Sequence, residues 1–382
     1  MISVMMPVYN AARFLKPSIE SILNQTEHDF ELIIVNDGST DNSEEIIFSF
    51  TDKRIRYVRQ ENKGEGAARQ VALELAKGDY IAFQDHDDIS LPYRLQLMKS
   101  RFVSPDIGLV HSDMMLIDDT DRVIGYWASS NIEKSRLLRF FLKVGTPFNN
   151  PTMMLRRESM NNFHYDATIR IGVDTDMVFN IAPMWNSVHI PEPLLMYRRY
   201  AQSLSRQGNY DTLALHVRKF ILQHTLRELF PELAWDQQKE SDFQAMASAL
   251  MALFLARRGM IYDVPEWLTK AKMYESSFET KNFITAVENI LSGNFTNAAL
   301  LLEQCAKNDY VIENYLGEVK ALQGNFEQAF QHFWRSLQLN PLYFEPAENL
   351  KALGKCRGGH SVDVTWTKFA GRSVLAGLSV RS

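Results

Sequence analysis

The feature that most constrains this chain is a change in its hydrophobic periodicity near residue 205. Before that point, short runs rich in β-branched and aromatic residues alternate with segments that have helical spacing. We expect strands at Ile2–Met6, Glu31–Asn36, Ile55–Arg59, Tyr80–Gln84 and Ile107–Ser112, and helices at Ala11–Gln25, Asp41–Phe50, Glu65–Lys77 and Pro92–Arg101. This alternation predicts an α/β fold with a mainly parallel sheet. Ligands on such sheets bind beyond the carboxyl ends of the strands, so the loops after the strands are the candidate site.

Beyond residue 206 the strand signals disappear, and amphipathic helices are expected at Thr212–Leu229 and Asp242–Arg258. The run Gly293-Asn294-Phe295 with Ala298 then recurs as Gly324-Asn325-Phe326 with Ala329, an offset of 31 residues. This repeat resembles the tetratricopeptide helix-turn-helix, whose usual period is about 34 residues. We divide the chain into an α/β domain at 1–205, a helical connector at 206–280, repeats at 281–350 and a loosely ordered tail at 351–382. The repeats could bind a protein partner or a second copy of the chain.

The charge balance and the cysteine count exclude several classes of protein. The chain has 382 residues, with 41 Lys and Arg against 46 Asp and Glu, so its net charge is −5. A mildly acidic chain has no bulk electrostatic reason to bind nucleic acid. Only Cys305 and Cys356 are present, which excludes a disulfide framework and fits a reducing compartment. With no apolar run of about 18 residues and a first strand expected from Ile2, we predict a cytoplasmic protein, which could sit at the inner face of the membrane.

The strongest candidate for chemistry is the acidic loop Asp85-His86-Asp87-Asp88, which directly follows an apolar strand. Its carboxylates repel one another, and nothing close in the sequence neutralises them. A divalent cation would do so, and carboxylate oxygens favour Mg²⁺ or Mn²⁺, which keep open positions for phosphate oxygens. The alternative is a solvated acidic turn that caps the helix near Pro92.

Three other loops follow strands and could line the same crevice. In Asn36–Asp41, the Asp37 carboxylate could accept hydrogen bonds from a base N–H or a ribose hydroxyl. In Pro7–Asn10, Tyr9 could stack on a base, and in Asn62–Arg69 the arginine could approach a base or phosphate. Taken alone, each loop is also compatible with an ordinary turn or helix start.

Together these motifs resemble a family 2 glycosyltransferase of the GT-A fold over roughly residues 1–205. The matching runs are Pro7-Val8-Tyr9-Asn10, Asn36-Asp37-Gly38-Ser39-Thr40-Asp41, Gly64…Ala67-Ala68-Arg69 and Gly78-Asp79-Tyr80…Asp85-His86-Asp87-Asp88. The resemblance implies an inverting enzyme that uses Mn²⁺ or Mg²⁺ and a nucleotide-diphospho-sugar, with a UDP-sugar as the first expectation. It implies that Pro7, Tyr9, Asp37 and Arg69 surround the base, that Asp85 meets the ribose, and that Asp87 and Asp88 hold the metal.

The same resemblance indicates the catalytic base. The family's later Glu-Asp motif falls at Val173-Asp174-Thr175-Asp176, so Asp174 is the expected base, with Asp176 as the substitute because Val173 replaces the first acid. A histidine of many members falls at Tyr200 here, where Arg198 or Arg199 could supply positive charge.

The resemblance leaves the acceptor open, as a glycan, a lipid-linked glycan or a protein. Two segments have no assigned role: Arg136–Lys143, a basic apolar helix that could touch anionic lipid, and Gly145–Thr152, which could form part of an acceptor pocket. The competing hypothesis is a non-catalytic nucleotide-binding scaffold that recruits partners through its helical repeats.

Overall fold

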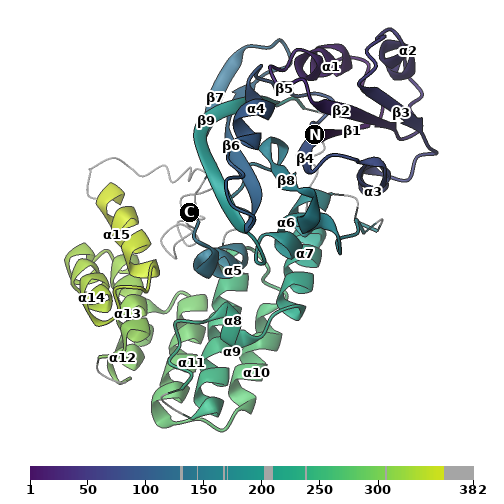
Figure 1. Ribbon diagram of the computed structural model, residues 1–382. Helices are drawn as coiled ribbons and strands as arrows, with labels where there is room; N and C mark the ends of the chain where they lie inside the picture. The colour runs from purple at the N-terminus through teal and green to yellow at the C-terminus, as the bar shows by residue number, and fades with distance from the viewer. Residues whose placement is uncertain are drawn as a thin grey trace. The chain divides into compact units, whose positions relative to one another are not determined.

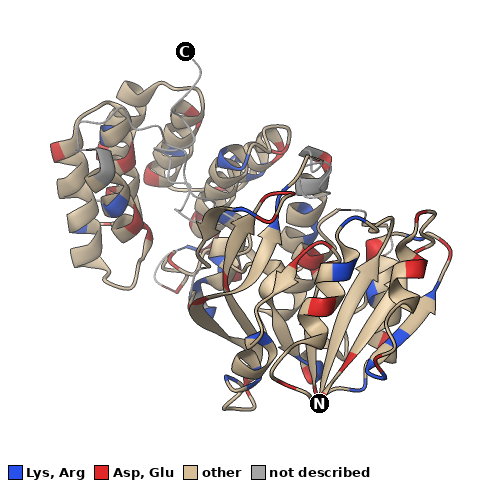
Figure 2. Cartoon of the chain, turned by 90° about the horizontal axis from the view of Figure 1, so that it is seen from above, with Lys and Arg blue, Asp and Glu red and all other residues tan. Residues whose placement is uncertain are grey.

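The computed structural model describes residues 1–129, 132–143, 145–166, 168–169, 171–201, 210–236, 239–305 and 308–356. The chain forms two compact units (Figure 1). The first comprises residues 1–141 and 146–216, and the second comprises residues 142–145 and 217–382. Lys and Arg are interspersed with Asp and Glu along the elements of both units (Figure 2).

A mixed sheet forms the centre of the first unit, with the order β3-β2-β1-β4-β8-β6-β9-β5 and with β7 paired to β6. The strands are β1 (Ile2–Val8), β2 (Phe30–Asn36), β3 (Ile55–Arg59), β4 (Tyr80–Phe83), β5 (Ile89–Ser90), β6 (Ile107–Ile117), β7 (Val123–Trp127), β8 (Met154–Arg156) and β9 (Asn186–Arg198). Strands β1, β2, β3 and β4 pair in parallel, as expected from the sequence, and β6 pairs in parallel with β9, a strand that the sequence did not predict. The pairs made by β5, β7 and β8 are antiparallel.

The hydrophobic core of the first unit lies against β1 and β2, which are buried along their whole length. This burial explains why both strands read as continuous apolar runs. The helices of the unit are α1 (Leu15–Leu23), α2 (Ser43–Phe48), α3 (Glu65–Leu75), α4 (Arg94–Lys99), α5 (Lys134–Lys143) and α6 (Val173–Ile181). The core cluster takes side chains from α1, α2 and α4, including Leu15, Ile47 and Leu95. Helix α3 contacts β1 and β2 and lies across the sheet from α1 and α2 (Figure 1).

Two helix boundaries differ from the sequence prediction for local reasons. Helix α1 begins at Leu15 and not at Ala11, because Asn10 has a φ of 48° and its side chain accepts a hydrogen bond from the Thr40 N–H at 2.8 Å. The helix expected at 212–229 is two helices, α7 (Tyr210–Leu222) and α8 (Leu226–Leu229). A capping box between Thr225 and Glu228 starts α8.

Residues 134–141 of helix α5 belong to the first unit. The Phe141 ring lies 4.7 Å from the Phe179 ring of α6, and 6.5 Å from that of Phe148, between centroids. The apolar face of this basic segment therefore contacts protein.

The described residues of the second unit form helices joined by turns and loops, with no strand among them. After α7 and α8 come α9 (Glu240–Arg257), α10 (Val264–Met273), α11 (Phe278–Leu291), α12 (Phe295–Glu303), α13 (Tyr310–Leu322), α14 (Phe326–Leu339) and α15 (Glu345–Cys356). Helix α11 contacts α12, and α13 contacts α14. Within the part of the chain that the structure describes, no helix has the length and apolar character needed to cross a membrane. Residues 357–382, most of the expected tail, lie outside the described residues.

The two copies of the Gly-Asn-Phe repeat form equivalent turns. Gly293 and Gly324 both have a φ of 80°, and the asparagine after each caps the next helix. Asn294 accepts a hydrogen bond from the Asn297 N–H, and Asn325 accepts one from the Gln328 N–H. The repeat therefore encodes a helix-turn-helix, whereas its membership of the tetratricopeptide class stays a prediction.

We expect the two alanine substitutions Gly324→Ala and Gly354→Ala to have opposite effects on stability. Gly324 needs a left-handed conformation although its Cβ position is open, so the substitution should cost about 1–2 kcal/mol. Gly354 lies in α15 with nothing within 4 Å of its Cβ position, so alanine there should stabilise the protein by about 0.5–1 kcal/mol. Urea unfolding of both variants measures the difference. Equal effects would contradict the assigned turn.

Candidate functional site

The carboxyl ends of β1, β2 and β4 lie at one edge of the sheet, because β1 pairs in parallel with both neighbours. The loops after these strands carry Tyr9, Asp37 and the acidic loop Asp85–Asp88. Residues that are distant in the sequence thus share one edge of the first unit.

Asp37 is 3% exposed, and its carboxylate holds the loop that leads into α3. Its Oδ1 accepts hydrogen bonds from the Gln60 side chain at 2.7 Å and the Lys63 N–H at 2.9 Å, and Oδ2 accepts one from the Gly64 N–H at 2.8 Å. A hollow beside Asp37 is lined by Gly38, Arg59, Gln60, Glu61 and Asn62. The structure thus gives Asp37 an organising role next to open space.

Tyr9 and Pro7 take different positions in the loop after β1. Tyr9 is 47% exposed, which leaves much of its ring open to solvent. Pro7 is buried within β1, and its carbonyl oxygen lies 3.3 Å from His86 Nδ1 in the acidic loop. The Pro7 carbonyl therefore lies next to the acidic loop, whereas the Tyr9 side chain is exposed and available to a ligand.

Arg69 lies buried between two carboxylates. Its guanidinium donates to Asp85 Oδ1 at 2.8 Å and lies 2.7 Å from Glu65 Oε1. Burial disfavours the charge of Arg69, but the nearby carboxylates outweigh burial and raise its pKa. No residue close in the sequence neutralises the acidic loop, but in the folded chain Arg69, 16 residues earlier, pairs with Asp85.

Asp174 belongs to the same electrostatic cluster. Burial raises the pKa of Glu65, and the charges of Asp85 and Asp174 raise it further against the opposing effect of Arg69. Asp174 also adds to the rise in the pKa of Arg69. The acid expected as the base therefore lies within electrostatic range of the arginine that binds Asp85.

The start of α6 distinguishes the two candidate bases. Asp174 is half-buried in the first turn, where its Oδ1 accepts the Thr175 N–H at 2.8 Å and its Oδ2 accepts the Asn150 Nδ2 at 2.5 Å. Asp176 is 4% exposed. Asp174 is thus the more accessible of the two carboxylates, beside the positive end of the helix dipole.

The second half of the acidic loop is bound by Arg198 at the end of β9 and by Tyr200, two residues later. The Tyr200 hydroxyl donates to Asp87 Oδ2 at 2.9 Å, and the Arg198 N–H donates to Asp88 Oδ1 at 2.9 Å. The Arg198 side chain donates to the Asp87 carbonyl at 2.8 Å and lies over the Phe14 ring. Burial, with Asp87 nearby, raises the pKa of Tyr200. Arg198 thus holds the loop in place from inside the fold, whereas Arg199 is exposed.

The acidic loop has one feature that fits a divalent cation. Asp88 is buried, and its Oδ2 has no hydrogen-bond partner. Burial raises the pKa of Asp88, and the charges of Asp87 and Asp85 raise it further. A cation beside Asp87 would relieve this repulsion. Among the described residues, no three His, Cys, Asp or Glu side chains form a metal site by themselves, so ligand oxygens would have to complete the coordination.

The sequence interpretation missed two residues that contact the predicted site. Glu65 pairs with Arg69 four positions later, and this spacing on a helix is a recognisable signal. Asn150 binds Asp174 from another part of the chain, and no local pattern reveals that contact.

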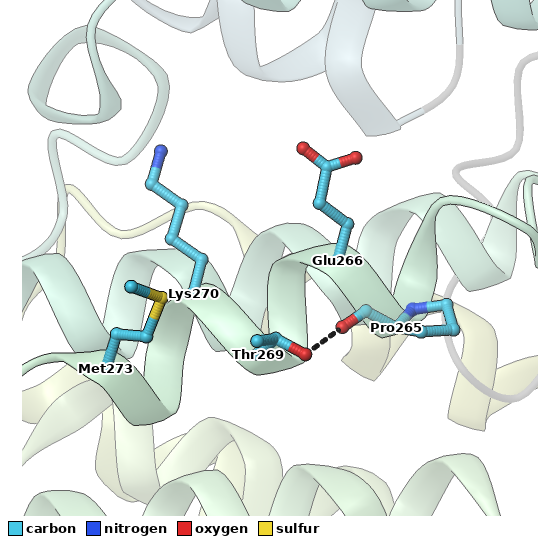
Figure 3. Close-up of a pocket in the computed structure, with 5 residues that line it drawn as sticks. All are labelled: Pro265, Glu266, Thr269, Lys270 and Met273. Atoms are coloured by element: carbon cyan, nitrogen blue, oxygen red, sulfur yellow. Dashed lines mark hydrogen bonds between the residues drawn. The ribbon is translucent and has the colours of Figure 1, made fainter.

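A further hollow lies on the surface of α10 in the second unit and is lined by Pro265, Glu266, Thr269, Lys270 and Met273 (Figure 3). Thr269 donates a hydrogen bond to the Pro265 carbonyl, so its hydroxyl is satisfied within the helix. None of the lining residues is among the predicted site residues.

Comparisons with known proteins give a consistent family. Residues 3–163 match the model of glycosyl transferase family 2. An uncharacterized glycosyltransferase of Methanocaldococcus jannaschii is 34% identical over 230 residues, which cover 56% of this chain and 79% of the relative. The UDP-Glc:alpha-D-GlcNAc-diphosphoundecaprenol beta-1,3-glucosyltransferase WfgD of Escherichia coli is 34% identical over 140 residues, 36% of this chain and 55% of that protein. The mannosyltransferase PcManGT of Pyrobaculum calidifontis, solved with GDP-Man and Mn²⁺, is 16% identical with a TM-score of 0.47, covering 86% of this chain and 85% of that one.

Proposed function

Because this chain belongs to glycosyl transferase family 2, we propose that it moves a sugar from a nucleotide-diphospho-sugar to an acceptor hydroxyl with inversion at the anomeric carbon. The observation that carries the inverting mechanism is the position of Asp174, a half-buried carboxylate within electrostatic range of the Arg69 that binds Asp85. Asp174 would then be the single base near the acidic loop Asp85–Asp88, which is expected to contact the donor.

In the proposed reaction, Asp174 accepts the proton of the acceptor hydroxyl as the hydroxyl oxygen attacks the anomeric carbon. The bond from that carbon to the diphosphate oxygen breaks, and the nucleoside diphosphate leaves on the opposite face. A positioned base of this kind contributes about 10²–10⁴-fold. Attack and departure on opposite faces invert the centre, as in inverting glycoside hydrolysis.

The donor site is proposed at the sheet edge. Tyr9 would stack on the base, with Pro7, Asp37 and Arg69 around it, and Asp85 would meet the ribose. The exposure of Tyr9 and the hollow beside Asp37 support this arrangement. The internal hydrogen bonds of Asp37 and Arg69 suggest that both also hold the loops in shape.

Asp87 and Asp88 would hold Mn²⁺ or Mg²⁺, as the unpartnered Asp88 oxygen supports. When bound, such an ion stabilises the charge on the leaving diphosphate as a Lewis acid.

A UDP-sugar donor and a lipid-linked glycan acceptor are proposed because the WfgD relative is named for transfer from UDP-Glc to a GlcNAc-diphosphoundecaprenol. That acceptor would place the enzyme at the cytoplasmic face of a membrane, in the synthesis of a surface polysaccharide or another glycoconjugate.

The test of the proposed function is to incubate the protein with Mn²⁺ and UDP-glucose, UDP-N-acetylglucosamine or GDP-mannose, with and without a GlcNAc-diphospholipid. Release of nucleoside diphosphate that the lipid accelerates supports the proposal, whereas no release from any donor contradicts it.

We expect Asp87→Ala to lower Mn²⁺-dependent nucleoside diphosphate release by roughly 10²–10³-fold, because it removes a proposed ligand of the ion that stabilises the leaving group. The matched control is Tyr200→Phe, which removes the same Tyr200–Asp87 hydrogen bond but keeps the carboxylate. Metal titrations of both variants separate the two effects. Equal loss in the two variants would show that the hydrogen bond matters and the metal role does not.

The repeat region favours a second, compatible role in binding a protein partner or another copy of the chain. Phe330 and Trp334 on α14 are 45% and 51% exposed, and their rings are parallel within 3°. Exposed neighbouring aromatic residues are typical of interaction surfaces. Sedimentation of the full chain and of the Phe330→Ser/Trp334→Ser variant tests self-association through this face. An assembly that is unchanged in the variant would exclude it.

A further inference from the structure

We propose that Asn150 is a positioning residue for the glycosyl transfer, which holds the carboxylate of Asp174 in the orientation needed to accept a proton. This inference rests on the proposed role of Asp174 as the base. It assigns a function to the Gly145–Thr152 segment, which the catalytic scheme above does not use.

The contact itself has defined chemistry. The Asn150 Nδ2 donates to Asp174 Oδ2 at 2.5 Å, and the Thr175 N–H donates to Asp174 Oδ1 at 2.8 Å. A carboxylate is only an acceptor when ionised, so the amide nitrogen of Asn150 must face it. Each carboxylate oxygen therefore has one fixed donor, and lone pairs remain for an acceptor hydroxyl. Two donors from different elements fix the plane of the carboxylate, which a single donor would leave free to rotate.

The backbone around Asn150 is held firmly enough to serve this purpose. The neighbouring Asn149 donates from its side chain to the carbonyls of Ser112 in β6 at 3.2 Å and Trp127 in β7 at 3.1 Å. The Thr152 hydroxyl accepts the Ser112 N–H at 3.0 Å and donates to the Asn149 carbonyl at 2.7 Å. Asn149 and Thr152 are both buried. These bonds tie the turn before β8 to the sheet on both sides of Asn150.

Asn150 itself is not needed for this anchoring. Its side chain is half-buried, and its remaining contact is with Thr146, whose hydroxyl lies 3.5 Å from Asn150 Oδ1. The two adjacent asparagines thus have separate tasks. Asn149 fixes the turn to the sheet, and Asn150 reaches from that turn to Asp174.

The test compares variants of these two asparagines in the full chain. Asn150→Ala, and the isosteric Asn150→Asp that also repels Asp174, should lower kcat for nucleoside diphosphate release roughly 10–100-fold, since misplacement of a reacting group by about 1 Å has effects of that size. The Kd for UDP and the Tm should stay unchanged.

Two control variants complete the comparison. Asn149→Ala should lower the Tm by roughly 2–4 °C, and the exposed Asn161→Ala should change neither kcat nor the Tm. A loss in Asn150→Ala that Asn150→Asp restores would contradict the proposal, because it would indicate packing and not donation.

A double-mutant cycle separates this inference from the proposed function. If Asn150 acts through Asp174, then Asn150→Ala causes no further loss of single-turnover rate in an Asp174→Asn background. An equal further loss in that background overturns the positioning role and leaves Asp174 as the base. A wild-type rate in Asp174→Asn alone overturns the assignment of the base, whatever Asn150 does.

Discussion

Replacing Asp174 by Asn should lower the rate of glycosyl transfer by about 10²–10⁴-fold, the contribution of a positioned general base. The amide that replaces the carboxylate has nearly the same shape but cannot accept the proton of the acceptor hydroxyl. The Asn150 and Thr175 donors face this side chain; the Thr175 N–H can still donate to the amide oxygen, and Asn150 can turn its own amide to accept from the new NH₂ group. Nucleoside diphosphate release under single-turnover conditions measures the loss, and the affinity for UDP should be retained.

Asp176→Asn is the matched control, because Asp176 lies in the same helix and was the substitute candidate for the base. Its side chain is buried at 4% exposure, so it is not placed to meet an acceptor. We expect this variant to keep its turnover rate apart from any change in the folded fraction. A variant at position 176 with the larger loss in rate per folded molecule would reverse the assignment.

The second large effect is expected on stability. Arg69→Met removes the cation that pairs with Glu65 and Asp85, and leaves these carboxylates close together in a partly buried cluster with Asp174. Breaking a buried ion pair by removing one partner costs roughly 3–5 kcal/mol. Urea unfolding monitored by circular dichroism should show this decrease in the free energy of unfolding.

Arg13→Met provides the comparison for Arg69→Met. Arg13 pairs with Asp119 at 2.8 Å, but the two side chains are 59% and 45% exposed. Exposed pairs contribute at most about 1 kcal/mol. A loss for Arg69→Met no larger than that for Arg13→Met would mean that Arg69 does not hold the acidic cluster together.

The first half of the sheet could be predicted from the sequence because its signals are local. Strands β1 to β4 are short apolar runs separated by helical segments, and their parallel pairing follows from that alternation. The family 2 resemblance, the α/β fold followed by helices, and the assignment as a glycosyltransferase are all confirmed.

The second half of the sheet could not be predicted in the same way. Strand β9 contains Pro191 and Pro193, which argue against a strand in a sequence. It pairs with β6 through register shifts around Asp113, and its other partner, β5, has only two residues. These pairings depend on contacts across the sheet that no local periodicity encodes.

The candidate site also contains some residues that the sequence shows and some contacts that it does not. The acids appear in the sequence as motifs, because each follows a strand or starts a helix. Their partners do not, since Tyr200 binds Asp87 and Asn150 binds Asp174 from distant parts of the chain. Charge alone suggested that a divalent cation neutralises the acidic loop, whereas the fold supplies Arg69 for Asp85 and leaves a buried oxygen of Asp88 without a hydrogen-bond partner.

The most direct test of the central claim is a crystal structure of the chain with UDP and Mn²⁺, using the anomalous signal to locate the metal. We predict one manganese peak between the carboxylate of Asp87 and the diphosphate, with the uracil ring beside Tyr9 and Asp174 facing the open side of the phosphate. A nucleotide bound away from the loops after β1, β2 and β4, or a manganese ion without contact to the acidic loop, would contradict this proposed site.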